Sequence, residues 1–130
     1  MIYLDTSALV KLVFEEPESA GLVTWLATRP DAPKISSDLS MVELLRTCRR
    51  IDDTSLGDAA ALLGGIDLVP IDRAIVERAA VLAPRQLRSL DAIHLASAMS
   101  IQADLTTMVA YDTRLCAAAA DAGIDVSSPT

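Results

Sequence analysis

Residues 106–113 of this 130-residue chain, TTMVAYDT, decide its fold class. The stretch begins with β-branched and apolar residues, a composition typical of a buried strand. Asp112 follows, and apolar positions then recur at helical spacing through residues 113–122 until Gly123 ends the pattern. A strand that leads through a polar residue into a helix is the repeating unit of α/β proteins.

The same unit recurs along the rest of the chain. Further short strands are predicted at residues 2–4, 33–36, 66–71 and 124–126. Further helices are predicted at residues 6–14, 15–28, 37–48, 52–63, 73–82 and 91–101, the third of them capped by Ser37 or Ser40. We therefore expect a single domain over residues 1–130 with a three-layer α/β fold. Its sheet would be mostly parallel, with four or five short strands and helices on both faces.

The composition restricts the class of protein. Apolar residues make up 52% of the chain and aromatic residues 3%, so a core of Ala, Leu, Val and Ile can form without disulfides. No apolar run approaches the ~20 residues that span a bilayer, and the first residues lack the basic flank of a signal peptide. Cys48 and Cys116 have no His or Cys nearby, which favours buried free thiols over a zinc site. We expect a cytoplasmic protein.

The net charge of −7 argues against a protein that coats nucleic acid with a basic surface. It is compatible with a nuclease, because carboxylates gathered around a divalent metal contribute negative charge until the metal binds. The arginines either form solvated helix faces or offset this acidity beside RNA phosphates. They cluster in two stretches: Arg46, Arg49 and Arg50, and then Arg73, Arg78, Arg85 and Arg88. Of these, we select Arg46, Arg49 and Arg88 as candidate RNA contacts.

Two acids directly follow predicted strands. Asp5 comes after the strand at residues 2–4, and Asp112 comes after the strand at residues 106–111. Ligands of parallel α/β sheets bind beyond the carboxyl ends of the strands, so both acids would lie at that edge. An Asp in this position also often caps the helix that follows. For either residue alone, both interpretations stay open.

Two further acids lie on predicted helices. Asp91 begins a helix with almost no charged face, where a carboxylate is costly to bury unless it is paired or bound to metal. The alternative is a first-turn acid stabilised by the helix dipole. Glu43 stands at the capping-box distance from Ser40 and at an ion-pair distance from Arg46. Taken alone, the sequence around Glu43 indicates a structural role. Glu43 becomes a candidate site residue only together with the other three acids.

Four acids that converge would suit metal-assisted hydrolysis of a phosphodiester. Magnesium and manganese prefer oxygen ligands, and such ions supply an activated water and positive charge beside the phosphate. No Ser-His-Asp set competes, because the only histidine, His94, lies inside the apolar helix and is expected to be a packed or locally bonded core residue. No glycine-rich phosphate loop is present, which disfavours binding of nucleoside triphosphates.

Four stretches of the chain resemble the acidic motifs of PIN domains. They are residues 1–9 (MIYLDTSAL), 42–44 (VEL), 90–96 (LDAIHLA) and 109–115 (VAYDTRL). Their order and spacing match, residues 90–96 are the most specific of them, and the resemblance covers essentially the whole chain. Within PIN domains, the compact size is similar to the VapC-type toxins of bacterial toxin–antitoxin pairs.

The resemblance implies an endoribonuclease that depends on Mg²⁺ or Mn²⁺, is inhibited by a small cognate antitoxin and forms a homodimer. By matching position, Asp5 and Asp91 would be the main metal ligands, and Glu43 and Asp112 would complete the catalytic pocket directly or through water. Thr6 and Ser7 match supporting hydroxyl positions, and Ser7 could orient a water or a phosphate. Ala110 departs from the family, in which many members carry Thr or Ser, so a hydroxyl contact is missing there.

Three other functions compete with this interpretation. A haloacid-dehalogenase-like phosphatase also opens with a strand and an Asp, but Ser7 stands where its second Asp is expected, and the two lysines, Lys11 and Lys34, are far from the later acids. A phospho-receiver domain would need an acidic pair after the first strand and a late lysine, and both are missing. A catalytically silent PIN scaffold that binds a partner stays open, although the chain keeps all four acids.

Overall fold

The computed structural model describes all 130 residues and contains one sheet of five parallel strands. The strands are β1 (Ile2–Leu4), β2 (Lys34–Ser37), β3 (Asp67–Val69), β4 (Thr107–Val109) and β5 (Val126–Ser127). Their order in the sheet is β3-β2-β1-β4-β5, so β1 is central and pairs with β2 and β4. The predicted number of strands is confirmed, and every pair is parallel.

Seven α-helices connect the strands. They are α1 (Thr6–Val13), α2 (Ser19–Ala27), α3 (Asp38–Ile51), α4 (Leu56–Gly64), α5 (Arg73–Val81), α6 (Ser89–Ser100) and α7 (Thr113–Asp121). The helix predicted from residue 15 begins only at Ser19, because the Glu16 amide donates to the Ser19 hydroxyl (2.9 Å) in a turn before it. Ser37, and not Ser40, caps α3. None of the helices is long and apolar enough to cross a membrane.

The core lies on both faces of the sheet, as the three-layer prediction required. Side chains of a strand alternate between its faces, so Ile2 and Leu4 pack into a cluster with helices α1 to α4. Tyr3 points the other way, into a second cluster that includes Leu95 of α6 and Leu115 of α7. Central β1 is therefore buried on both sides. This close packing fixes the position of Asp5, which directly follows the strand.

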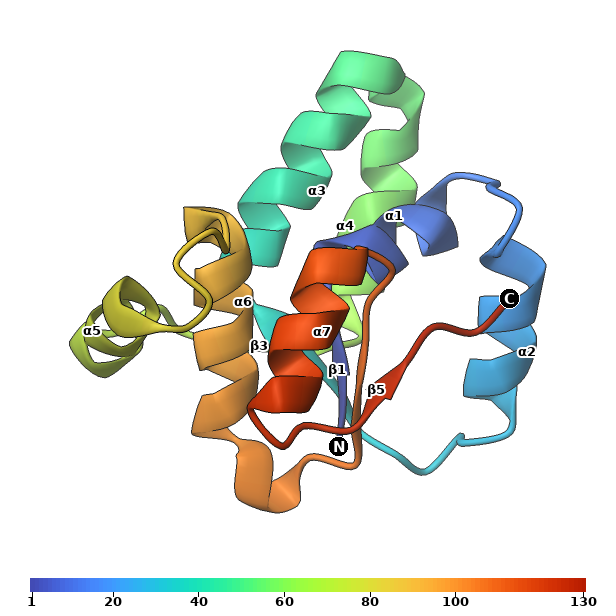
Figure 1. The fold of residues 1–130 in the computed structure, drawn as a ribbon. Helices are drawn as coiled ribbons and strands as arrows, with labels where there is room; N and C mark the ends of the chain where they lie inside the picture. Colours follow the sequence, from blue (N-terminus) through green and yellow to red (C-terminus); the bar gives the residue numbers. More distant parts are fainter.

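The carboxyl ends of the strands meet at one edge, from which the α3–α4 hairpin stands out (Figure 1). The Asp5 amide donates to the Val109 carbonyl (2.9 Å), which fixes the end of β1 beside the end of β4. Helix α3 starts directly after β2, and α1 starts directly after Asp5. The starts of α1 and α3 and the end of β4, which are far apart in the sequence, therefore lie at the same edge of the sheet.

The two cysteines differ in burial. Both are free thiols, and Cys48 is buried in the core as predicted. The prediction is wrong for Cys116, which is only partly buried. Its sulfur lies beside the Ala110 carbonyl and the Ser128 hydroxyl, close to the surface.

Candidate active site

Asp5 lies at the end of the central strand and is the most buried of the four predicted acids, with a side chain that is 8% exposed. Its Oδ2 accepts hydrogen bonds from the Ser7 amide (3.1 Å) and the Ser7 hydroxyl (2.7 Å), so Asp5 does cap α1. Its Oδ1 faces His94 Nε2 at 3.6 Å. Capping therefore uses one carboxylate oxygen and leaves the other toward the candidate site.

Ser7 connects two parts of that site. Its hydroxyl donates to Asp5 and accepts from the Tyr111 amide (3.3 Å), which directly precedes Asp112. Ala110, where many PIN domains carry a hydroxyl, is fully buried and offers no ligand. Ser7 therefore adds a second link between the β1 and β4 ends, beside the bond from the Asp5 amide to the Val109 carbonyl.

Glu43 reaches this edge from α3 through contacts with α1 and α6. Its Oε1 accepts hydrogen bonds from Thr6 Oγ1 (2.7 Å) and from His94 Nε2 (2.6 Å). Neither the capping box nor the ion pair with Arg46 forms. Burial alone would raise the pKa of Glu43, but the hydrogen bonds from His94 and Thr6 outweigh it and lower the pKa. Glu43 is therefore ionised at neutral pH.

His94 is buried, as predicted, but its bonds belong to the candidate site. Its Nδ1 lies 2.7 Å from the Tyr3 hydroxyl, and its Nε2 bonds Glu43. An ionised carboxylate can only accept, so Nε2 carries a proton. Burial alone would lower the pKa of His94, but the Glu43 hydrogen bond and the charge of Asp5 raise it. His94 thus places a hydrogen-bond donor between two of the acids.

Sequence reasoning missed the part that His94 and Tyr3 play at this edge. A signal was present for His94, because it follows Asp91 by one helical turn and therefore shares its face of the helix. Nothing in the local sequence indicates that Tyr3 would meet His94, since the two residues are far apart in the chain and meet only through packing of α6 on the sheet.

Tyr3→Phe is expected to lower the free energy of unfolding by about 1–3 kcal/mol, because it leaves the buried Nδ1 of His94 without a partner. Urea denaturation followed by circular dichroism measures the change. Tyr111→Phe is the matched control: it removes a bond to the Pro129 carbonyl (2.7 Å) at a partly exposed position and should cost less. Equal midpoints for Tyr3→Phe and the wild type would contradict the buried bond.

Asp91 lies in the first turn of α6 and does not cap it. The cap position is Arg88, and no side chain makes a capping hydrogen bond there. The Asp91 carboxylate is 20% exposed and lies 3.5 Å from Arg88 Nε. Burial raises the pKa of Asp91, and the charges of Asp112 and Asp5 raise it further. The first-turn position agrees with the helix-dipole alternative, and the neighbouring acids are what a role in the site requires, so both interpretations stay open for Asp91.

Asp112 caps α7 with one oxygen and faces the other acids with the second. Its Oδ1 accepts from the Leu115 amide (2.9 Å), and its Oδ2 lies 3.6 Å from Arg88 Nη2. The Arg88 guanidinium therefore lies between Asp112 and Asp91. Because the Arg88 side chain is 69% exposed, water screens both contacts and they are weak.

The donor set fits a hard divalent cation. All four acids offer carboxylate oxygens, the ligands that hard divalent cations prefer. No three His, Cys, Asp or Glu side chains are close enough together to form a finished metal cage.

The three candidate RNA contacts do not lie together. Arg88 is among the acids, whereas Arg46 and Arg49 lie on the outward part of α3, where they line a separate hollow with Arg50. The selection of Arg46, Arg49 and Arg88 as RNA contacts therefore stays a prediction, and it involves two different places on the surface.

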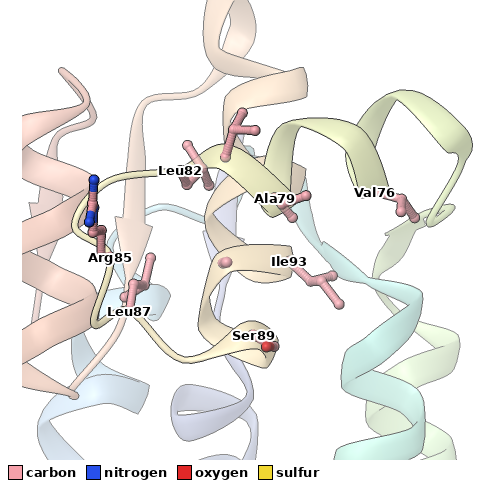
Figure 2. Close-up of a pocket in the computed structure, with 10 residues that line it drawn as sticks. Val76, Ala79, Leu82, Arg85, Leu87, Ser89 and Ile93 are labelled. Atoms are coloured by element: carbon pink, nitrogen blue, oxygen red, sulfur yellow. The ribbon is translucent and has the colours of Figure 1, made fainter.

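The largest hollow of the molecule lies away from the acids, between α5 and α6 (Figure 2). It measures about 530 Å³, and its walls are mostly apolar: Val76, Ala79, Leu82, Leu87 and Ile93. None of the four acids lines it. Hydrolysis of a phosphodiester needs charge and hydrogen bonds, so we place the candidate active site at the carboxylates and not in this larger hollow.

Known proteins share this architecture. The family model described as PIN domain matches residues 2–121. Ribonuclease VapC47 of Mycobacterium tuberculosis is 41% identical over 132 residues, covering 99% of this chain and 97% of the relative. Ribonuclease VapC35 of the same species is 44% identical over 131 residues, with the same coverage of 99% and 97%.

Solved structures agree on the fold. The crystal structure of Mycobacterium tuberculosis VapC20, described as a Sarcin-Ricin loop cleaving toxin, matches with a TM-score of 0.77 at 18% identity, covering 99% of this chain and 100% of that one. VapBC2 from Rickettsia felis, bound to a DNA fragment from its promoter, matches with a TM-score of 0.78 at 12% identity and full coverage of both chains (100%).

The chain belongs to the PIN domain family. Within that family, its curated relatives at 39–44% identity over nearly the whole length are VapC ribonucleases. The family resemblance and the fold predicted from the sequence are thereby confirmed.

Proposed function

We propose that this chain is a metal-dependent endoribonuclease and the toxin of a VapC-type toxin–antitoxin pair. The observation that carries the proposal is the meeting of four acids from four separate segments at one edge of the sheet. Like charges gathered in a partly buried place cost stability, and such arrangements concentrate at functional sites. The names of the curated relatives support the same activity. Cellular RNA as the substrate would place the protein in the cytoplasm.

In this proposal Asp5 and Asp91 hold Mg²⁺ or Mn²⁺, and Glu43 and Asp112 complete the pocket directly or through water. The bound ion would supply an activated water and positive charge beside the scissile phosphate. Hydrogen bonds from His94 and Thr6 lower the pKa of Glu43 and orient its carboxylate. Burial and the charges of Asp112 and Asp5 raise the pKa of Asp91, and a bound cation would offset these charges.

The two supporting hydroxyls act on the acids. The Ser7 hydroxyl is engaged by Asp5 and by the Tyr111 amide, and the Thr6 hydroxyl donates to Glu43. We infer that both are positioning residues that fix carboxylate orientation. The Ser7 hydroxyl uses its donor and one lone pair in these bonds, so its second lone pair stays available to orient a water.

The test compares two substrates. The purified chain is incubated with Mg²⁺, Mn²⁺ or EDTA, once with total cellular RNA and once with p-nitrophenyl phosphate. We expect cleavage of RNA that requires the metal and no hydrolysis of the phosphate ester. Hydrolysis of the ester alone would indicate a phosphatase. Failure to cleave any RNA, with antitoxin binding retained, would indicate a silent scaffold.

The acidic pocket also suits a basic inhibitor. An arginine binds carboxylates through two parallel hydrogen bonds, and Arg88 already lies 3.5 Å from Asp91 and 3.6 Å from Asp112. We propose that the C-terminal segment of the cognate antitoxin enters the pocket with an Arg or Lys and displaces or shields the metal.

This mode of inhibition predicts competition. An antitoxin peptide with its basic residue should weaken the apparent affinity for Mn²⁺ in proportion to the peptide concentration, as measured by calorimetric titration. The same peptide with that residue changed to Ala should bind without affecting Mn²⁺ affinity. A complex that leaves all four carboxylates open to solvent would contradict the proposal.

A homodimer is part of the proposal as well. The groove between α5 and α6 is mostly apolar, and two of its lining residues, Val76 and Val81, are 42% and 82% exposed. Apolar patches of this kind mark contact surfaces, so this face is the one we assign to a second copy. Sedimentation equilibrium of the wild type and of Val81→Asp measures whether a dimer forms through it.

A further inference from the structure

Helix α3 carries three arginines that line one hollow. Arg46, Arg49 and Arg50 surround a space of about 370 Å³ whose lining contains no other residue. All three are exposed. None of them forms an ion pair. Three guanidinium groups that converge without a protein partner leave their hydrogen-bonding capacity for a ligand.

Stabilisation of the helix dipole does not account for this cluster. Arg49 and Arg50 lie in the last turn of α3, where positive charge is favourable. Arg46 stands before that turn, and the α3 carbonyls receive no hydrogen bond from any of the three side chains: the helix ends with the Asp52 amide bonded to the Cys48 carbonyl. Stabilisation of the C-terminal end of α3 therefore does not explain why all three arginines lie together.

The cluster lies on the same helix as Glu43, further from the sheet edge. Arg46 and Arg50 follow Glu43 by three and seven residues, so they share its face of the helix. At 1.5 Å per residue they stand roughly 4.5 and 10.5 Å further along the helix axis than Glu43. Figure 1 shows α3 rising from the carboxyl edge of the sheet into solvent. The arginines thus extend outward from the carboxylates.

We propose that Arg46, Arg49 and Arg50 form a phosphate-binding track for the RNA strand on one side of the scissile bond. This inference rests on the proposed ribonuclease function. Arginine pairs with phosphate oxygens through its planar fork. A chain of net charge −7 repels RNA as a whole, so binding needs a local positive path to the carboxylates.

The hollow favours a phosphate strand over a protein helix. A docking groove for an amphipathic helix needs an apolar floor, and the lining of this hollow contains no apolar residue. An acidic segment of a protein partner is the competing ligand, and the experiment below separates it from RNA.

The binding test uses Arg46→Gln/Arg50→Gln and a matched control, Arg73→Gln/Arg78→Gln, which removes the same charge from α5. The probe is fluorescein-labelled oligouridine, measured by fluorescence anisotropy at several salt concentrations with EDTA present so that no cleavage occurs. The α3 variant should bind on the order of tenfold more weakly at low salt. Its slope of log affinity against log salt should fall by about 1.4, since each lost phosphate contact on a single strand removes about 0.7.

The control variant should keep the wild-type slope. Removing nucleotides from one end of the oligouridine should weaken wild-type binding more than removing them from the other end. In the α3 variant the two truncations should have equal effects. Thermal melts verify that both variants are folded. Because the substituted side chains are exposed, their melting temperatures should match that of the wild type.

Equal slopes for the wild type and the α3 variant would overturn the proposal. So would normal RNA binding combined with weakened binding of the antitoxin, because the arginines would then serve an acidic protein segment. Failure of the ribonuclease function gives a different result: the wild type would show the arginine-dependent salt slope yet cleave no RNA when Mn²⁺ is added.

Discussion

Asp91→Asn is expected to reduce metal-dependent RNA cleavage at least roughly 100-fold while the protein stays folded. Asn preserves the shape of the side chain but loses the negative charge that would bind the cation. A 100-fold loss corresponds to about 3 kcal/mol of transition-state stabilisation, within what a bound metal contributes. Asp5→Asn should have a similar effect, because the charge of Asp5 is close enough to Asp91 to raise its pKa. Initial cleavage rates at saturating Mn²⁺ measure both.

Asp72→Asn is the matched control for these substitutions. Asp72, like Asp5, lies between a strand and the helix that it caps: its Oδ1 accepts from the Ile75 amide (2.9 Å). Unlike Asp5 and Asp91, it has no other acid beside it. Asn caps about as well as Asp, so this variant should cleave at the wild-type rate. Wild-type rates in Asp91→Asn, with the metal present, would remove Asp91 from the catalytic set.

Mn²⁺ is expected to raise the melting temperature of the wild type by roughly 10 °C for a domain of this size. A ligand that binds only the folded state, at ~100 times its dissociation constant, stabilises that state by about 2.7 kcal/mol. The structure supplies the reason for a strong response. Burial and the charges of Asp112 and Asp5 raise the pKa of Asp91, so its ionised form costs folding free energy until a cation offsets it.

Asp91→Asn separates the metal role from a structural one in the same melts. Without metal, its melting temperature should equal or exceed that of the wild type, because the substitution removes a repelled charge. With Mn²⁺, its increase should be much smaller than in the wild type. Asp72→Asn should keep the full increase. An undiminished increase in Asp91→Asn would show that this carboxylate does not bind the metal.

Local sequence patterns predicted the fold class and the edge at which the acids meet. The alternation of Ile2, Tyr3 and Leu4 between two cores, and the strand, acid and helix of residues 106–122, reflect the periods of strands and helices. Parallel strands end at the same edge, so Asp5, directly after β1, and Asp112, three residues after the end of β4, come together there. The strand predicted at residues 106–111 ends earlier in the structure, at Val109. The motif of residues 90–96 added Asp91 through its resemblance to PIN domains.

Only the tertiary structure decided which side chains meet at that edge. Glu43 fits a capping box in sequence, yet it bonds His94, from which it is separated by 51 positions. Arg88 lies among the acids, whereas Arg46 lies outside them, although both were selected for the same reason. These outcomes depend on the rotation of α3 and α6 about their axes and on the close packing that fixes it. Local periodicity determines which face of a helix is apolar, but the partner of each polar side chain is set by the elements packed around it.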